Sequence, residues 1–277
     1  SAFSPTHLSG CKFLIDASDI STMECSLSRQ FINSQYLGTD TYQTGIMYSG
    51  QYSFGVWATP YAIDPGSTTI FGLRSTGSAN PILGLFRLNG GIAEFFVRDS
   101  AGQNSVAGNA IVSVNSPICL IGTRNGDTVT MYTNNSSAAG SVPAGSFSAI
   151  DNQTCLTLGA TVNASAVKTN FFSGVIHGAW IWNSALTASQ VSAFYNNGRQ
   201  LRFSQLSGVL LDNLIDCWEL GETSGIAINR KTNTNLSQFN NPIGVFFFCL
   251  DVYNGAGVTR IASKSGGSHI AATFGTG

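Results

Sequence analysis

The sequence predicts an almost all-β protein folded as an antiparallel sandwich of two sheets. Charged residues make up only 10% of the 277 residues, and glycine is abundant at 31. Ser, Thr and Asn fill the stretches between short apolar runs, which is typical of many strands joined by tight turns. Length alone allows one large sandwich with an appendage or two small domains.

The first long strand is expected over residues 51–60 (QYSFGVWATP), where apolar residues alternate with small or polar ones until Pro60 ends the run. Similar short runs, separated by Gly, Asn, Asp or Pro, follow at residues 68–73, 82–88, 92–98, 111–114 and 118–123. This regular spacing favours a sandwich or a barrel.

Two hairpins are expected at residues 89–91 (NGG) and 125–127 (NGD), because these residues tolerate positive φ. In the first hairpin Arg87, Glu94 and Arg98 can share one face of the sheet. These three residues are the candidate ligand-binding residues. The alternative is that this polar face is only solvated.

A short helix is expected over residues 188–195. Thr187 and Gln190 form a capping box, and Leu186 can pack on Val191 as a hydrophobic staple. Residues 196–198 (NNG) suit a left-handed C-cap. The helix should cover a sheet and pack against the edge of the sandwich.

Residues 171–198 (FFSGVIHGAWIWNSALTASQVSAFYNNG) carry a Gly-containing strand, then W-N-x-A-L-T, then a helix ending in Y-N-x-G. This stretch resembles the closing signature of laminin G-like domains in the concanavalin A-like superfamily. The segments QFINSQYLGTD, YSFGVWATP and GDTVTMYTNN fall in the family's order, so the resemblance covers residues 9–198. It implies a two-sheet jelly roll over residues 1–198.

Residues 211–236 (LDNLIDCWELGETSGIAINRKTNTNL) resemble the opening of the same kind of domain, although no second copy of the later strands follows. Residues 199–277 are therefore either a partial second repeat or a C-terminal β extension that docks on the first sandwich. Large apolar side chains occupy both faces of any strand formed by residues 243–252 (IGVFFFCLDV), so we expect its neighbours to cover it. The candidate assembly contact comprises Val245, Phe246, Phe247, Phe248 and Leu250.

The charge pattern excludes several partners. The net charge is −1 and no Lys or Arg cluster occurs, which argues against nucleic acid as a partner.

No apolar run approaches the roughly 20 residues that span a bilayer, and no signal peptide is visible. The six cysteines show no CxxC, so a zinc site is not expected, and buried free thiols are favoured over disulfides.

Catalysis is not expected. Glycoside hydrolases need two carboxylates that face each other across a cleft. The nearest acidic pair, Glu219 and Glu222, is three residues apart, so a strand would place the two side chains on opposite faces. His177 is expected to be a hydrogen-bonded sheet residue, and His7 and His269 lack triad or ligand neighbours.

The resemblance raises calcium as a cofactor, but no motif supports it. Asp64, Asp99, Asp127 and Asp151 lie in separate turns. Trp180 and Trp182 share a face that the family pattern places beneath the helix; a sugar-stacking role is the alternative.

Two functions remain. The first is a non-enzymatic structural protein, such as a bacteriophage virion decoration, cement or fibre component at the particle surface. Its expected partners are further copies of the same chain, in a homo-oligomer, and other structural protein subunits. The second is a lectin-like module that binds a surface glycan, with glycoside hydrolysis third. The low charge and the apolar C-terminal extension favour the first.

Overall fold

A computed structural model describes residues 24–32, 34–42, 50–76, 81–99, 104–141, 154–222, 225–240, 242–253 and 258–265. The chain divides into two compact units. One is Leu27–Val245, and the other combines Ser1–Ser26 with Phe246–Gly277.

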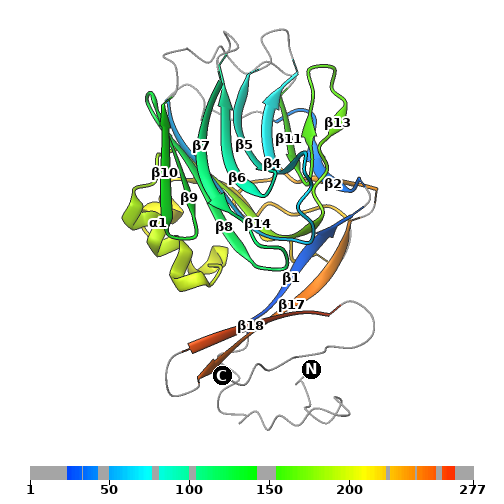
Figure 1. Ribbon diagram of the computed structural model, residues 1–277, viewed down its shortest axis with the longest axis vertical. Helices are drawn as coiled ribbons and strands as arrows, with labels where there is room; N and C mark the ends of the chain where they lie inside the picture. The colour runs from blue at the N-terminus through cyan, green and yellow to red at the C-terminus, as the bar shows by residue number, and fades with distance from the viewer. Residues whose placement is uncertain are drawn as a thin grey trace. The chain divides into compact units, whose positions relative to one another are not determined.

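The Leu27–Val245 unit is a sandwich of two antiparallel sheets (Figure 1). The helix-side sheet has the order β10 (Ser136–Ser141), β9 (Thr128–Thr133), β8 (Ile118–Asn125), β3 (Gln51–Pro60), β14 (Gly174–Trp182) and β1 (Glu24–Phe31), with β15 (Leu214–Trp218) also paired to β14. The seven-stranded sheet has the order β16 (Ser237–Phe239), β2 (Tyr36–Thr39), β11 (Thr154–Leu158), β4 (Ser67–Ser75), β5 (Ile82–Asn89), β6 (Ile92–Arg98) and β7 (Asn104–Ile111). A small hairpin joins β12 (Thr161–Val162) to β13 (Lys168–Thr169).

The predicted all-β class and both predicted hairpins are confirmed. β5 pairs with β6, and β8 pairs with β9. Gly90 and Gly91 have φ of 57° and 84° in the first turn, and Gly126 has φ of 59° in the second. These are left-handed conformations that glycine adopts without a steric penalty, so the turn residues set the register of both hairpins.

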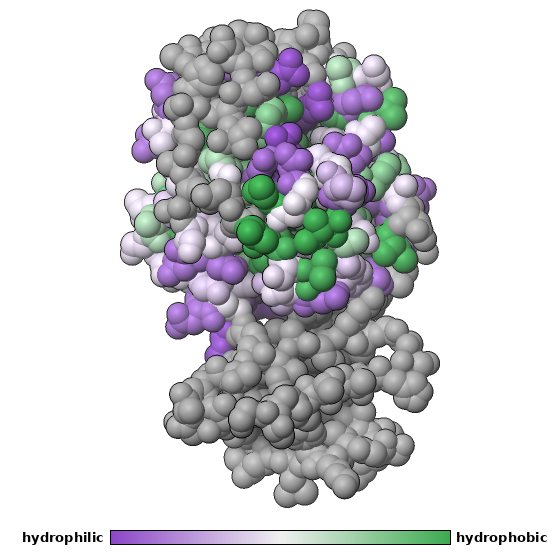
Figure 2. Space-filling view, viewed as in Figure 1, coloured by the Kyte–Doolittle hydropathy of each residue, from purple (hydrophilic) through white to green (hydrophobic). Residues whose placement is uncertain are grey.

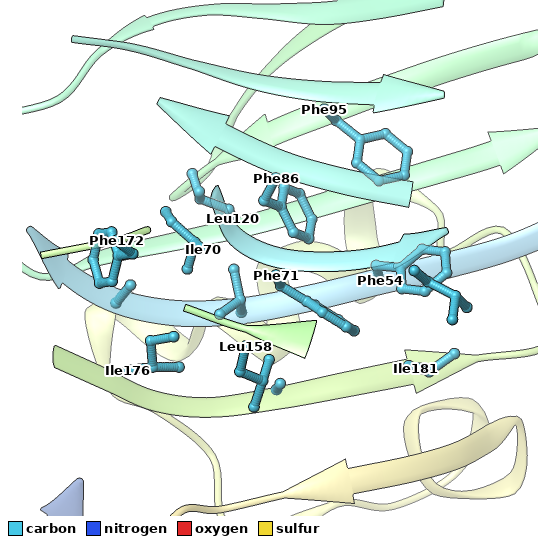
Figure 3. Packing of buried hydrophobic residues seen from close by; sticks show 14 of the residues in the cluster. Phe54, Ile70, Phe71, Phe86, Phe95, Leu120, Leu158, Phe172, Ile176 and Ile181 are labelled. Atoms are coloured by element: carbon cyan, nitrogen blue, oxygen red, sulfur yellow. The ribbon is translucent and has the colours of Figure 1, made fainter. Parts of the chain in front are cut away.

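The core fills the space between the sheets. Phe54 from β3 meets Phe71 from β4 edge to face, with ring centroids 5.5 Å apart, and Phe86 and Phe95 lie 5.0 Å apart. Figure 3 shows these rings with Ile70, Leu120, Leu158, Phe172, Ile176 and Ile181, which come from both layers. Burial of these large apolar side chains is the main stabilising term of the sandwich.

The predicted helix is confirmed as α1 (Ala188–Tyr195). Gln190 donates its backbone N–H to Thr187 Oγ1, and the Gln190 side chain accepts from the Thr187 backbone N–H at 2.8 Å. Asn196 closes the helix in the left-handed conformation, with φ of 45°. Both helix ends are therefore capped as the sequence predicts.

The helix covers a sheet with Trp180 and Trp182 beneath it, as predicted. The predicted position of α1 at the edge of the sandwich is wrong, because the helix packs on the face of central strands. Phe194 meets Trp180 and Trp182 of β14 edge to face, at 5.0 and 5.2 Å. Tyr195 stacks on Trp57 of β3 at 5.8 Å. These tryptophans lie on central strands, so α1 covers the outer face of the helix-side sheet, together with the single turn α2 (Val209–Asp212) and apolar residues from 201–214.

Residues 199–245 belong to the same compact unit as the sandwich, so the boundary expected after Gly198 falls inside that unit. β15 pairs with β14, and β16 pairs with β2 in the other sheet. Trp218 is fully buried in the core between the sheets. The segment that resembles the opening of a domain therefore completes both sheets of this same sandwich.

The other unit is described by the hairpin of β17 (Ile243–Tyr253) and β18 (Val258–Ser265), paired antiparallel from Phe246↔Ser265 to Tyr253↔Val258. The side chains of the expected assembly contact, Val245, Phe246, Phe247, Phe248 and Leu250, lie outside the described residues.

Candidate functional site

The two outer faces of the sandwich differ in chemistry. The outer face of the helix-side sheet is covered by a dry apolar cluster that includes Trp57, Trp180, Trp182 and Phe194. The outer face of the seven-stranded sheet instead carries half-buried charged and aromatic side chains on β4, β5 and β6. A sheet face with several partly exposed polar groups beside an aromatic ring is the stronger candidate for ligand binding.

Strand alternation brings the predicted residues to this face. Along β6, Ala93, Phe95 and Val97 are fully buried in the core. Glu94, Phe96 and Arg98 alternate with them and are half-buried on the outside. Arg87 of β5 stands directly opposite Glu94. The structure thus places Arg87, Glu94 and Arg98 on one face, as the sequence predicts.

Arg87 links an aromatic ring to a carboxylate. Its guanidinium carbon lies 4.6 Å from the ring centroid of Phe96, and its Nε donates to Glu94 Oε2 at 2.5 Å. Asn89 donates its side-chain N–H to the other oxygen, Glu94 Oε1, at 3.4 Å. The side chains of Arg87 and Glu94 are 24% and 14% exposed, so solvent still reaches the pair. The contacts hold a carboxylate, a guanidinium and an amide in fixed positions above the sheet.

A further arginine, Arg74 of β4, belongs to the same face, although sequence reasoning missed it. Arg74 pairs with Ile82 of β5, and Ile82 pairs with Arg98 of β6. A register shift between Leu73 and Arg74 sets this alignment. Short-range patterns do not reveal such bulges. The one signal in the sequence was that Arg74 directly follows the predicted strand at 68–73. We define the arginine face as Arg74, Arg87, Glu94, Phe96 and Arg98.

Burial and like charge act together at Arg74. Desolvation lowers the pKa of its guanidinium, and the nearby positive charge of Arg98 lowers that pKa further. The Nε of Arg98 is buried and has no hydrogen-bond partner within the described residues. Two cationic groups of the arginine face therefore lie close together.

The other residues considered from the sequence have structural contacts. Arg230 pairs with Glu219 at 3.3 Å and with Glu222 at 3.2 Å. His177 is confirmed as a hydrogen-bonded sheet residue, with its Nδ1 2.8 Å from Ser28 Oγ and its Nε2 2.8 Å from Thr59 Oγ1. His7 and His269 lie outside the described residues.

The acidic residues considered for calcium are dispersed. Asp64 Oδ1 accepts from the Gly66 backbone N–H at 2.8 Å, Asp127 is exposed in the β8–β9 turn, and Asp99 is buried. Asp151 lies outside the described residues. No group of three or more His, Cys, Asp or Glu residues in the described part of the chain could hold a metal ion.

The described cysteines are buried thiols. Cys119, Cys155 and Cys217 form no disulfide among the described residues, and desolvation raises the pKa of the first and the last. The side chains of the remaining three, Cys11, Cys25 and Cys249, lie outside the described residues. Buried thiols of this kind act as small apolar groups.

Apolar surface gathers in one area of the view in Figure 2. Four exposed apolar side chains, Ile63, Ile92, Ile111 and Val114, are neighbours in the structure. Ile92 pairs with Ile111, which is 86% exposed, and a Cβ on Gly91 would lie 3.1 Å from Ile63. Asn115 donates its backbone N–H to Pro60 O at 2.6 Å, which brings Val114 to the same place. We call these four residues the apolar patch.

The two sheets and the closing strand with its helix define the class of protein, a laminin G-like sandwich. Residues 33–192 match the laminin G-type family of the concanavalin A-like lectin/glucanases superfamily. The chain belongs to this superfamily. No curated protein matches the chain. No helix within the described ranges is long and apolar enough to cross a membrane.

Several solved structures resemble the chain at low sequence identity. A Bacteroides ovatus ATCC 8483 protein provisionally described as carbohydrate-binding matches with a TM-score of 0.56 and 15% identity. The match covers 79% of this chain and 61% of that protein. The heptameric SAP-like pentraxin of Limulus polyphemus has a TM-score of 0.47 and 13% identity, with 61% of this chain and 82% of that chain covered. Domains LG4-5 of the mouse laminin alpha1 chain have a TM-score of 0.45 and 12% identity, with 59% and 46% covered.

Proposed function

We propose that the chain is a non-catalytic carbohydrate-binding module that binds a glycan on the arginine face. The observation that carries the proposal is Arg87, which is stacked against Phe96 and bonded to Glu94 on a partly exposed sheet face. The fold is shared with the Bacteroides ovatus protein that is provisionally described as carbohydrate-binding. The findings thus favour the glycan-binding alternative over a particle component.

The chemistry of the face suits a sugar. A pyranose presents vicinal hydroxyls that donate and accept, and an apolar C–H surface that packs on flat groups. Glu94 supplies carboxylate oxygens as acceptors, while Arg87 and Asn89 supply N–H donors. The Arg87–Phe96 stack supplies a flat surface. Because the bonds among these groups orient them in advance, little side-chain entropy is lost on binding.

A glycan array followed by titration calorimetry tests this function. We expect Glu94→Gln and Arg87→Met to weaken binding of the best array ligand roughly tenfold or more, since a lost hydrogen bond to a charged group costs about 1.5 to 3 kcal/mol. The matched control is Glu222→Gln, which alters a different arginine–carboxylate pair. Absence of binding on the array, or normal binding by Glu94→Gln, would count against the proposal.

Assembly is the second candidate function, and the apolar patch is the observation that favours it. Ile111 is 86% exposed near the end of β7, the edge strand of the seven-stranded sheet. An exposed apolar cluster favours association with another chain. The occupant on this reading is a second copy of the chain, in a homo-oligomer or a larger particle.

Molar mass in solution tests assembly. We expect a dimer or larger oligomer for the unmodified chain and a monomer for Ile111→Glu, because a buried carboxylate would oppose the contact. The variant should remain folded, since Ile111 is mostly in solvent. An unmodified chain that is monomeric at high concentration would exclude this role of the patch.

A further inference from the structure

Two hairpin turns of the sandwich carry the same reactive pair of residues. Asn–Gly pairs occur in the sequence at residues 89–90, 125–126, 197–198 and 254–255. The first two occupy equivalent places, because Asn89 and Asn125 are the last residues of β5 and β8, and a two-residue turn follows each of them. Residues 197–198 follow α1, and residues 254–255 lie outside the described residues. The two hairpin sites can therefore be compared directly.

An asparagine followed by glycine is open to attack by its own backbone. The amide nitrogen of the glycine bonds to the side-chain carbonyl carbon of the asparagine, and the side-chain nitrogen leaves as ammonia with the proton that the glycine nitrogen gives up. Water then opens the cyclic imide at either carbonyl, which yields aspartate or isoaspartate. Glycine permits this attack because it has no side chain to hinder its nitrogen. In a folded hairpin the turn must also open locally, so weakly held turns react faster.

The second hairpin holds its reacting groups firmly. The Gly126 backbone N–H, which is the attacking group, donates to Gly50 O at 2.9 Å. The side-chain carbonyl of Asn125, which is the group attacked, accepts from Gln51 Nε2 at 3.0 Å. Both distances lie within the usual range for N–H···O hydrogen bonds. Ring closure at Asn125 therefore has to break two ordinary hydrogen bonds.

The first hairpin holds the same groups loosely. Asn89 and Gly90 are both exposed to solvent. The Gly90 backbone N–H donates to Gly66 O at 3.5 Å, and Asn89 donates its side-chain N–H to Glu94 Oε1 at 3.4 Å. Both distances lie beyond the usual range, so both hydrogen bonds are weak. The nitrogen of Gly90 and the side chain of Asn89 therefore approach each other at a lower cost than their counterparts in the second hairpin.

We propose that Asn89 is a site of spontaneous deamidation, and that this modification weakens binding at the arginine face. The modification follows from the hairpin alone, whereas its effect on binding rests on the proposed function. Deamidation replaces an amide donor by a second carboxylate beside Glu94, where like charges repel. Isoaspartate also adds one backbone atom at the end of β5, which disturbs the register that sets Arg87 opposite Glu94.

Peptide mapping by mass spectrometry tests the modification. The full chain is kept at body temperature and mildly alkaline pH, because the glycine nitrogen reacts after losing its proton, and samples are digested at intervals. We expect Asn89 to deamidate roughly fivefold faster than Asn125, the factor that one net hydrogen bond contributes. A synthetic peptide of residues 86–93 gives the rate without the fold. Equal rates at the two sites, or an intact Asn89 after the peptide has been fully modified, would overturn the proposal.

Calorimetry with the best array ligand tests the effect on the arginine face. We expect the aged chain and Asn89→Asp to bind roughly tenfold more weakly than the fresh chain, because an acceptor replaces a donor beside a charged group. Asn89→Gln forms the cyclic imide far more slowly, so its affinity should not decline with age. The matched control Asn125→Gln should age as the unmodified chain does.

The outcomes separate the modification from the proposed function. A chain that is fully modified at Asn89 and binds as tightly as before would overturn the effect on the arginine face. Deamidation at Asn89 in a chain that binds no glycan would overturn the proposed function together with that effect, and it would leave the modification standing.

Discussion

Replacing Arg29 with Met should lower the free energy of unfolding by about 3 kcal/mol, because several buried acceptors lose a charged donor together. Arg29 is fully buried in β1. Its Nη1 donates to Pro242 O at 3.1 Å and to Gln238 Oε1 at 3.3 Å, and its Nη2 donates to Gly225 O at 3.2 Å. The residue therefore ties the first strand of the sandwich to the segment that completes it.

Chemical denaturation measures this effect, with Arg230→Met as the matched control. The Arg230 side chain is 34% exposed and makes two surface ion pairs, which should contribute 1 kcal/mol or less. If both variants lost the same small amount of stability, Arg29 would not hold the segment in the way described.

Acidification from pH 6.5 to pH 4 should destabilise the sandwich by about 3 kcal/mol through His177 alone. Desolvation, assisted by the positive charge of Arg202, lowers the pKa of His177 from 6.5 to about 3. Between these two values the unfolded chain binds a proton that the folded chain does not, so stability falls as the pH falls. Each pH unit in this window costs about 1.4 kcal/mol.

Urea denaturation at a series of pH values, on the unmodified chain and on His177→Gln, isolates this contribution. Glutamine can still contact the hydroxyls of Ser28 and Thr59, but it does not titrate. The variant should show a shallower loss of stability over the window. An unchanged slope would mean that His177 takes up its proton in the folded state without penalty.

Short-range signals predicted much of this fold. The turn residues at 89–91 and 125–127 specify two hairpins because their backbone conformations require Gly or Asn. The capping box of Thr187 and Gln190 specifies the start of α1. Strand alternation together with the first hairpin was sufficient to place Arg87 and Glu94 side by side.

Features that depend on distant pairing or irregular register were not predictable. The pairing of β15 with β14 joins residues far apart in the chain, and local residue patterns carry no information about it. Arg74 reaches the arginine face through a register shift, and Phe96 acquires its importance only from the guanidinium stacked on it. The helix was predicted at the edge of the sandwich because the sequence does not reveal that β3 and β14, the strands that bear Trp57 and Trp180, are central in their sheet.

The completion of both sheets by β15 and β16 has a consequence for synthesis on the ribosome. β2 is translated early, but its partner β16 is among the last strands of the sandwich to be translated. Until then Trp218 and its neighbours are missing from the core, and the edges of β14 and β2 lack these partners. Nascent chains should therefore remain incompletely folded through most of translation, with slow, late closure and a need for protection from aggregation during that interval.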